Sequence, residues 1–250
     1  MNKHDPWEPL KQFTAARIAM GRAGSSIPVS NLLQFNVAHA HARDAVYSVL
    51  DREVLVEGLE QSGLPLLQVH SQARNRQEYL QRPDLGRLLD ERSLEILNQH
   101  AGTPCDVSLV VADGLSARAV NAHAVAVLEV LTAMLQAAGH TLAPVCLATQ
   151  ARVALADPLA HALHARLSII LIGERPGLSA ADSLGAYITY APRPGLTDES
   201  RNCISNIRPQ GLPYQPAAHR IFYLVQEALR RGLSGVGLKD NSLNQDSLEP

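Results

Sequence analysis

The sequence predicts an α/β protein: a Rossmann-like, doubly wound and mostly parallel sheet, with a small helical N-terminal region. Short, continuously apolar segments alternate with helical segments, as in parallel sheets that helices cover on both faces. Apolar residues make up 46% of the 250 residues but aromatic residues only 4%, which favours aliphatic helix-on-sheet packing over a β-sandwich. The pattern changes at Leu64. It divides the chain into a helical region, 1–63, and a Rossmann-like α/β domain, 64–250.

The region 1–63 is expected to contain two helices. In the first, apolar residues recur at near-helical spacing from Leu10 to Ile18. Ser30 is expected to cap the second, in which Leu33 and Val37 share a face. A polar cluster around Arg43 on the second helix is either a solvated face or a contact with a partner chain.

The α/β domain is expected to contain at least five strands. They are the apolar segments at 66–69, 107–111, 145–148, 168–172 and 187–190.

Helices are expected after the first strand, through Leu97, and three more follow along the chain. Ser116 can cap a long helix at 117–138, which Gly139 ends. Asp157 followed by proline predicts a second helix that reaches about residue 165. The last helix is expected at 217–231.

The expected sheet gathers three polar loops at one edge. In open α/β sheets, ligands bind beyond the carboxyl ends of the strands. Three loops follow strands there, at residues 113–116, 150–153 and 174–179. In the last loop, the turn at Gly177 is expected to need a positive φ, whereas Gly232, after a helix, is expected to tolerate a side chain.

Composition argues against several kinds of partner. A net charge of -2 argues against nucleic acid, which normally requires a basic surplus. No apolar run approaches the roughly 20 residues that cross a bilayer, so no membrane is expected. Three cysteines without a CxxC pair suit a reducing compartment, so we expect a cytoplasmic protein.

No familiar catalytic motif is present. The chain has no GxGxxG after a strand, no P-loop and no GxSxG. His161 and His164 lie three residues apart without a third ligand at metal spacing. We therefore expect no catalytic residue and no metal ligand from this chain.

Several runs, in order, nevertheless resemble one family. The most specific are Gly-Glu-Arg-Pro-Gly-Leu-Ser at 173–179 and Arg-Asn-Cys-Ile-Ser-Asn-Ile-Arg-Pro at 201–209. With the runs at 113–117 and 150–155, they resemble the small subunit of ethanolamine ammonia-lyase, an adenosylcobalamin-dependent bacterial enzyme. The resemblance covers nearly the whole chain. It departs where Ala156 replaces an expected glycine and Val29 an expected threonine.

The resemblance implies a non-catalytic subunit that is essential for activity. Family members pair with a larger barrel subunit, which carries the substrate pocket, and together they convert ethanolamine to acetaldehyde and ammonia. Adenosylcobalamin, with its own base on cobalt, would lie between the subunits, so that residues 64–250 form a cobalamin-binding domain. The resemblance also implies a hetero-oligomer, and it is compatible with residence in a bacterial microcompartment.

By resemblance, three residues would contact the cofactor: Val153, Glu174 and Cys203. The Glu174 carboxylate would accept hydrogen bonds from a corrin amide or the nucleotide tail. Val153 would offer backbone and an apolar surface, and Cys203 a small polarisable group or its backbone. Without the family, Glu174 would instead pair with Arg175 or Arg201, while Val153 would be a core valine and Cys203 an inert thiol.

Two other functions stay open at this point. The chain could be a free-standing α/β enzyme acting on a small polar or phosphorylated substrate, with Asp113 or Glu174 as general base. It could also be an assembly or chaperone protein that binds another chain through its helical N-terminal region.

Overall fold

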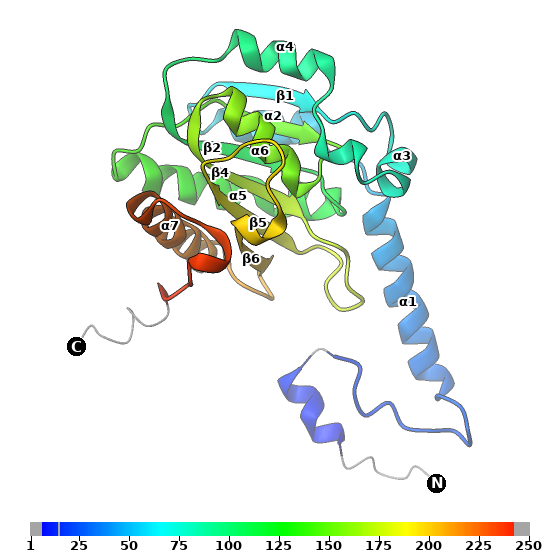
Figure 1. The fold of residues 1–250 in the computed structure, drawn as a ribbon. Coiled ribbons are helices and arrows are strands. Elements are labelled where there is room, and N and C mark those ends of the chain that lie inside the picture. Colours follow the sequence, from blue (N-terminus) through cyan, green and yellow to red (C-terminus); the bar gives the residue numbers. More distant parts are fainter. Residues whose placement is uncertain (1–6, 15, 243–250) are drawn as a thin grey trace, which may run out of the picture.

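A six-stranded mixed sheet forms the centre of the protein, in the strand order β1-β3-β2-β4-β5-β6 (Figure 1). The structure is a computed structural model, and it describes residues 7–14 and 16–242. The strands are β1 (Leu66–His70), β2 (Cys105–Ala112), β3 (Val145–Thr149), β4 (Ala165–Gly173), β5 (Leu184–Tyr190) and β6 (Arg201–Ile207). The first four are mutually parallel, and β5 and β6 extend the sheet in antiparallel fashion.

The α/β class is confirmed, but the sheet is mixed and not mostly parallel, so the doubly wound Rossmann-like arrangement is not confirmed. The connections explain the difference. A parallel crossover needs a dozen or more residues, usually with a helix. The links at 174–183 and 191–200 contain no α-helix, so β5 and β6 can return only as antiparallel neighbours. Strand β6 was not predicted, because pairs of polar residues at 201–202 and 205–206 interrupt its apolar pattern.

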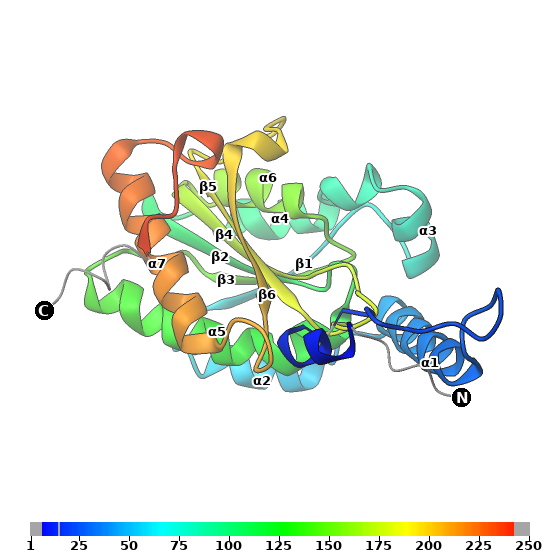
Figure 2. The same ribbon diagram turned by 90° about the horizontal axis from the view of Figure 1, so that it is seen from below.

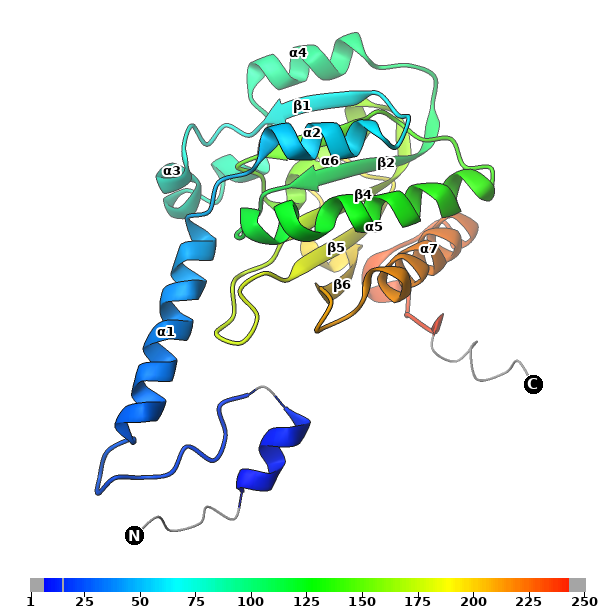
Figure 3. The same cartoon turned by 180° about the vertical axis from the view of Figure 1, so that it is seen from behind.

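Helices cover both faces of the sheet, and the two apolar cores lie beneath them (Figures 1 and 3). One face carries α2 (Arg52–Glu60), α5 (Ala117–Ala137) and α7 (Tyr214–Arg231). The other carries α4 (Glu91–Gln99) and α6 (Ala156–Ala162). The short helix α3 (Arg76–Gln81) lies at the carboxyl edge of the parallel strands. Figure 2 shows the sheet between these two layers.

The ends of the helices test the predicted caps. The Ser116 hydroxyl accepts a hydrogen bond from the Ala119 N–H at 3.3 Å, and Gly139 follows α5 with φ 78°, as predicted. Asp157 is not a cap. It lies inside α6, which ends at Ala162, and its buried carboxylate pairs with Arg201.

Helix α5 is the helix within residues 7–14 and 16–242 that is long and apolar enough to cross a membrane by length and composition. Half of its apolar window is buried inside the protein, where Val127, Leu131 and Leu135 belong to the core of the first face. Packing within the protein accounts for the apolar character of α5.

The N-terminal region contains helices, and they differ from the expected ones in detail. The first helix is a 3-10 helix, η1 (Glu8–Phe13), with no buried residue. The second, α1 (Val29–Val46), begins one residue before Ser30, which therefore does not cap it. Helix α1 extends away from the sheet (Figures 1 and 3), and Ala45 near its end is the buried residue among its members.

Candidate functional site

A cavity of about 450 Å³ opens at the carboxyl edge of the parallel strands, where the sequence placed the binding edge. Gly114 follows β2 there, Val153 follows β3 and Glu174 follows β4. Tyr187 and Ser205 line the cavity from the antiparallel strands β5 and β6. The cavity therefore combines the predicted loops with a sheet surface formed by the predicted strand β5 and by β6, which the sequence did not predict.

Glu174 is half-buried in the wall of this cavity. One carboxylate oxygen, Oε2, accepts a hydrogen bond from the Asn206 N–H at 3.1 Å. Within the described residues, no ion pair joins Glu174 to Arg175 or to Arg201. Arg201 instead pairs with Asp157. The simpler interpretation of Glu174 as an ion-pair residue is therefore wrong.

Val153 begins a 3-10 turn, η3 (Val153–Leu155), directly after the loop that follows β3. Its side chain is partly buried, packs against the second core and also lines the cavity. Val153 is thus both a packing residue and a wall of the cavity.

Cys203 lies beside the cavity and is exposed. It is opposite Tyr187 in the β5–β6 register. Because alternate residues of a strand share a face, Cys203 points to the same side of β6 as Ser205, which lines the cavity. Burial raises the pKa of the Cys203 thiol, and Tyr187 opposes this shift. The three predicted residues thus lie around one cavity.

The cavity floor requires two backbones to approach closely. Gly173 ends β4, Gly114 lies just beyond the neighbouring strand β2, and the Leu115 N–H donates to the Gly173 carbonyl at 2.9 Å. A Cβ atom on Gly173 would lie 2.1 Å from the Ser116 carbonyl oxygen, which is impossible without moving the backbone. The glycine that opens the 173–179 run is therefore needed for packing of the loops, whatever the ligand.

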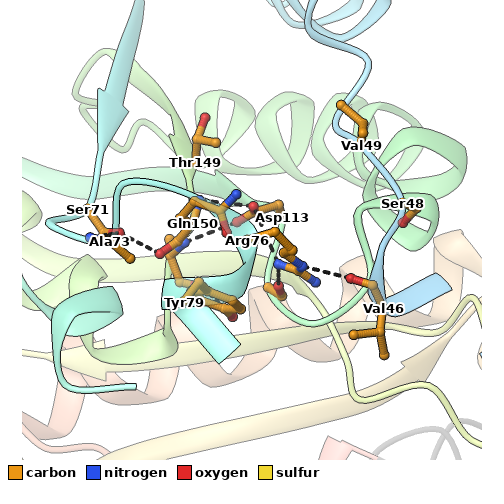
Figure 4. Close-up of polar contacts among 12 residues, drawn as sticks. Val46, Ser48, Val49, Ser71, Ala73, Arg76, Tyr79, Asp113, Thr149 and Gln150 are labelled. Atoms are coloured by element: carbon orange, nitrogen blue, oxygen red, sulfur yellow. Dashed lines mark hydrogen bonds and ion pairs between the residues drawn. The ribbon is translucent and has the colours of Figure 1, made fainter. Parts of the chain in front are cut away.

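Beneath the cavity, Arg76 joins three segments of the chain (Figure 4). Its guanidinium donates to the carbonyl oxygens of Val46 and Gly114, each at 2.7 Å. It also lies 3.8 Å from the carboxylate of Asp113, which accepts from the N–H groups of Gln150 and Ala151 at 2.9 and 3.0 Å. Burial raises the pKa of the Asp113 carboxyl, and these N–H groups and Arg76 oppose the shift. The end of α1 is therefore bound to the loops of the cavity.

Two arginines contact the ring of Tyr79 at the base of the cavity. The guanidinium carbons of Arg76 and Arg152 are 4.7 and 4.2 Å from the centre of its ring. Its hydroxyl donates to the Ala151 carbonyl at 3.1 Å, and the residue is fully buried. Such contacts between cations and an aromatic face stabilise the site when they are shielded from water. They hold Arg152, a wall of the cavity, in place.

Sequence reasoning missed Arg76, Tyr79 and Tyr187, and gave Arg152 no role of its own. Arg152 could have been identified from the sequence, because it lies in the 150–155 run next to Val153. Tyr79 could have been noticed as a rare aromatic residue in a polar segment, since only 4% of the chain is aromatic. Nothing local marks Arg76, whose partners come from distant segments.

Comparisons with known proteins agree with this arrangement of motifs. The family model described as ethanolamine ammonia-lyase light chain matches residues 4–239. The chain belongs to this family.

Curated members of the ethanolamine ammonia-lyase light chain family are similar along almost their whole length. The ethanolamine ammonia-lyase small subunit of Pseudomonas putida (strain W619) is 55% identical over 241 residues, covering 95% of this chain and 89% of that protein. The small subunits of Pseudomonas aeruginosa (strain LESB58) and Azotobacter vinelandii are each 54% identical, over 95% of this chain and 88% and 89% of those proteins.

Membership makes this chain the small subunit of a two-subunit lyase that has a large-subunit partner. The predicted family and activity are confirmed. The free-standing enzyme also fits the geometry poorly. Asp113, one of its two candidate general bases, is only 3% exposed and has both carboxylate oxygens occupied by backbone N–H groups.

Proposed function

We propose that this small subunit holds adenosylcobalamin, with its own base on cobalt, against the large barrel subunit through the cavity at Glu174. The holoenzyme would convert ethanolamine to acetaldehyde and ammonia. The observation that carries the proposal is a half-buried carboxylate in the cavity wall with one oxygen still available. Glu174 Oε2 accepts from Asn206, whereas no hydrogen bond or ion pair to Oε1 occurs within the described part of the chain.

The polar groups of the cavity suit a cofactor fringed with amides. A primary amide carries two N–H donors and one carbonyl acceptor, so its site must supply both functions. Glu174 can accept from the amide N–H groups, and Arg152 and Arg175 can donate to carbonyl oxygens. The Nε atom of Arg152 is buried and has no partner among the described residues, so part of this donor capacity is unused.

The size of the cavity suits a shared cofactor. Pockets of about 300–1,000 Å³ enclose drug-sized ligands, and a cobalamin is far larger. An open cavity of about 450 Å³ can therefore receive only one edge of it. The large subunit would cover the rest.

Each of the three predicted residues has a proposed role. Glu174 accepts a hydrogen bond from a cofactor amide, Val153 packs against the cofactor, and Cys203 borders it beside Tyr187. When bound, the cofactor supplies the radical chemistry through homolysis of its cobalt–carbon bond. This chain binds, orients and shields, and contributes neither a catalytic residue nor a metal ligand. We also propose a cytoplasmic location, which is compatible with a microcompartment.

Reconstitution tests the proposal directly. The purified chain, the large subunit and adenosylcobalamin are mixed, and acetaldehyde is measured. We expect turnover with all three components and none from the chain alone at any pH. Failure of the chain to support turnover with the large subunit, or turnover by the chain shown free of it, would contradict the proposal.

Glu174→Gln tests the site itself. The amide keeps an oxygen for Asn206 but places an NH2 group where the second carboxylate oxygen was. A hydrogen bond to a charged group contributes roughly 1.5–3 kcal/mol, so the apparent Kd for the cofactor should rise on the order of tenfold to a hundredfold. The maximal rate at saturating cofactor should change much less.

Subunit association, followed by sedimentation, is the control for this variant and should survive the substitution. If association collapses while the affinity for cofactor is unchanged, Glu174 is an interface residue and not a cofactor ligand.

A further inference from the structure

Helix α1 (Val29–Val46) exposes an unusual amount of apolar surface. Val29, Leu33 and Val37 are 70%, 59% and 55% exposed, and they form one row along the helix at intervals of four residues. Leu32, which is 47% exposed, adjoins this row, whereas Phe35, which is 36% exposed, lies on another side of the helix. Large contiguous apolar patches are uncommon on monomeric proteins and usually mark an interaction site.

The same stretch of α1 lacks formal charge. Between Val29 and Ala42 it contains no Asp, Glu, Lys or Arg, and its polar residues are Ser, Asn, Gln and His. An exposed helix of a soluble domain normally carries a charged face. The partner surface that fits α1 is therefore an apolar, largely uncharged groove, as in helix-in-groove recognition.

The base of α1 is fastened to the sheet domain. Arg76 binds the Val46 carbonyl at the end of the helix, and the Arg118 N–H donates to the Ser48 hydroxyl at 2.9 Å. Ala45, one residue before Val46, is only 1% exposed. Because the base is held, the projecting part of α1 has a defined direction relative to the cavity (Figures 1 and 4).

Helix α1 also projects from the end of the protein at which the parallel strands finish (Figures 1 and 3), and the cavity opens at that same edge. Arg76 connects the two, since it binds both Val46 and Gly114, and Gly114 lines the cavity. The Arg17 side chain, on the segment before α1, donates to the Leu178 carbonyl in the 174–183 loop at 3.4 Å. A partner that covers the cavity therefore lies within reach of α1.

From this arrangement we propose that α1 inserts the surface formed by Val29, Leu32, Leu33 and Val37 into an apolar groove of the large subunit. The inference rests on the proposed function, and it adds the main docking element of the small subunit. In this arrangement Arg76 couples the docked helix to the loops that hold the cofactor, because it binds both.

The double variant Leu33→Asp/Val37→Asp tests this proposal. Both side chains are exposed, so the substitutions should leave the thermal unfolding of the isolated chain unchanged. They would place two charges in the apolar groove, so the Kd for the large subunit, measured by titration of labelled chain, should rise on the order of a hundredfold or more. Val54→Asp on α2, whose side chain is 57% exposed, is the matched control and should bind normally.

Each result decides between the occupants of this surface. If the double variant binds the large subunit as wild type does, the docking proposal is wrong, while wild-type turnover would keep the proposed function. If wild-type chain dimerises on its own and the double variant does not, a second copy occupies α1 and the proposal is also wrong. If wild-type chain forms no complex with the large subunit, both the docking proposal and the proposed function fail.

Discussion

Asp157→Asn should destabilise this protein strongly, because it breaks a buried ion pair. The Asp157 carboxylate lies 2.7 Å from the Arg201 guanidinium, and both side chains are only 2% exposed. Removing one partner of such a pair typically costs about 3–5 kcal/mol, since the remaining charge stays buried without compensation. Arg201 would retain Thr189 at 3.3 Å and the Leu196 carbonyl at 3.2 Å, so we expect the lower end of this range.

The loss is measurable by thermal unfolding of the isolated chain. For a chain of this size, 1 kcal/mol shifts Tm by about 2–4 °C, so a loss of about 3 kcal/mol lowers Tm by roughly 6–12 °C. The matched control is Asp198→Asn. Asp198 also approaches Arg201, at 3.5 Å, but its side chain is 90% exposed, so its loss should shift Tm by no more than about 1–2 °C.

A double variant tests whether the loss of stability comes from the unpaired buried charge. Replacing both partners, as in Asp157→Leu/Arg201→Met, leaves no buried charge and should be less destabilising than Asp157→Asn alone. If Asp157→Asn unfolds within 1–2 °C of wild type, or if the double variant is the least stable of the set, the buried-pair reasoning is refuted. Confirmation would assign the first residue of the Arg-Asn-Cys run to stability and not to ligand binding.

Three further predictions concern the turns, the thiols and the response to pH. Gly232 caps α7 with φ 71°, whereas Gly177 has no positive φ and its nearest neighbour would be 3.4 Å from an added Cβ. Gly232→Ala should therefore lower the free energy of unfolding by about 1–2 kcal/mol and Gly177→Ala should change it little, which is the reverse of the expectation from the sequence. Equal Tm values for the two variants would contradict this prediction. A thiol reagent should label Cys203 alone in the isolated native chain, because Cys105 and Cys146 are buried and burial raises the pKa of Cys146 to about 12. Labelling of two thiols before unfolding would contradict this prediction. Burial lowers the pKa of His123, so the folded state takes up a proton less readily than the unfolded chain. The stability that depends on neutral His123 is present above pH about 6.5 and is lost as pH falls below it. Tm should therefore fall more steeply from pH 7 to 5 in wild type than in His123→Phe, and parallel curves would exclude this residue as the cause.

Much of the fold and the position of the site could be predicted from local patterns. The apolar runs became β2, β3 and β4 because a strand buried on both faces needs apolar residues at every position. Ser116 was correctly predicted as a cap, because its hydroxyl bonds to an N–H three residues away and needs no distant partner. The carboxyl edge was located correctly for the same kind of reason, since parallel strands end together.

Only the tertiary structure decided how these elements combine. Asp157 pairs with Arg201, Arg76 reaches Val46 and Gly114, and each contact joins segments that no local pattern connects. The sequence predicted a mostly parallel sheet and so gave the wrong direction for β5, because an apolar run has the same pattern in a parallel and in an antiparallel sheet. The short links forced β5 and β6 to be antiparallel, and this brought Tyr187 and Ser205 to the cavity wall. Local sequence determined which segments form strands and helices, because their patterns report burial. Long-range contacts decided the partners, because pairing depends on where the chain returns in space.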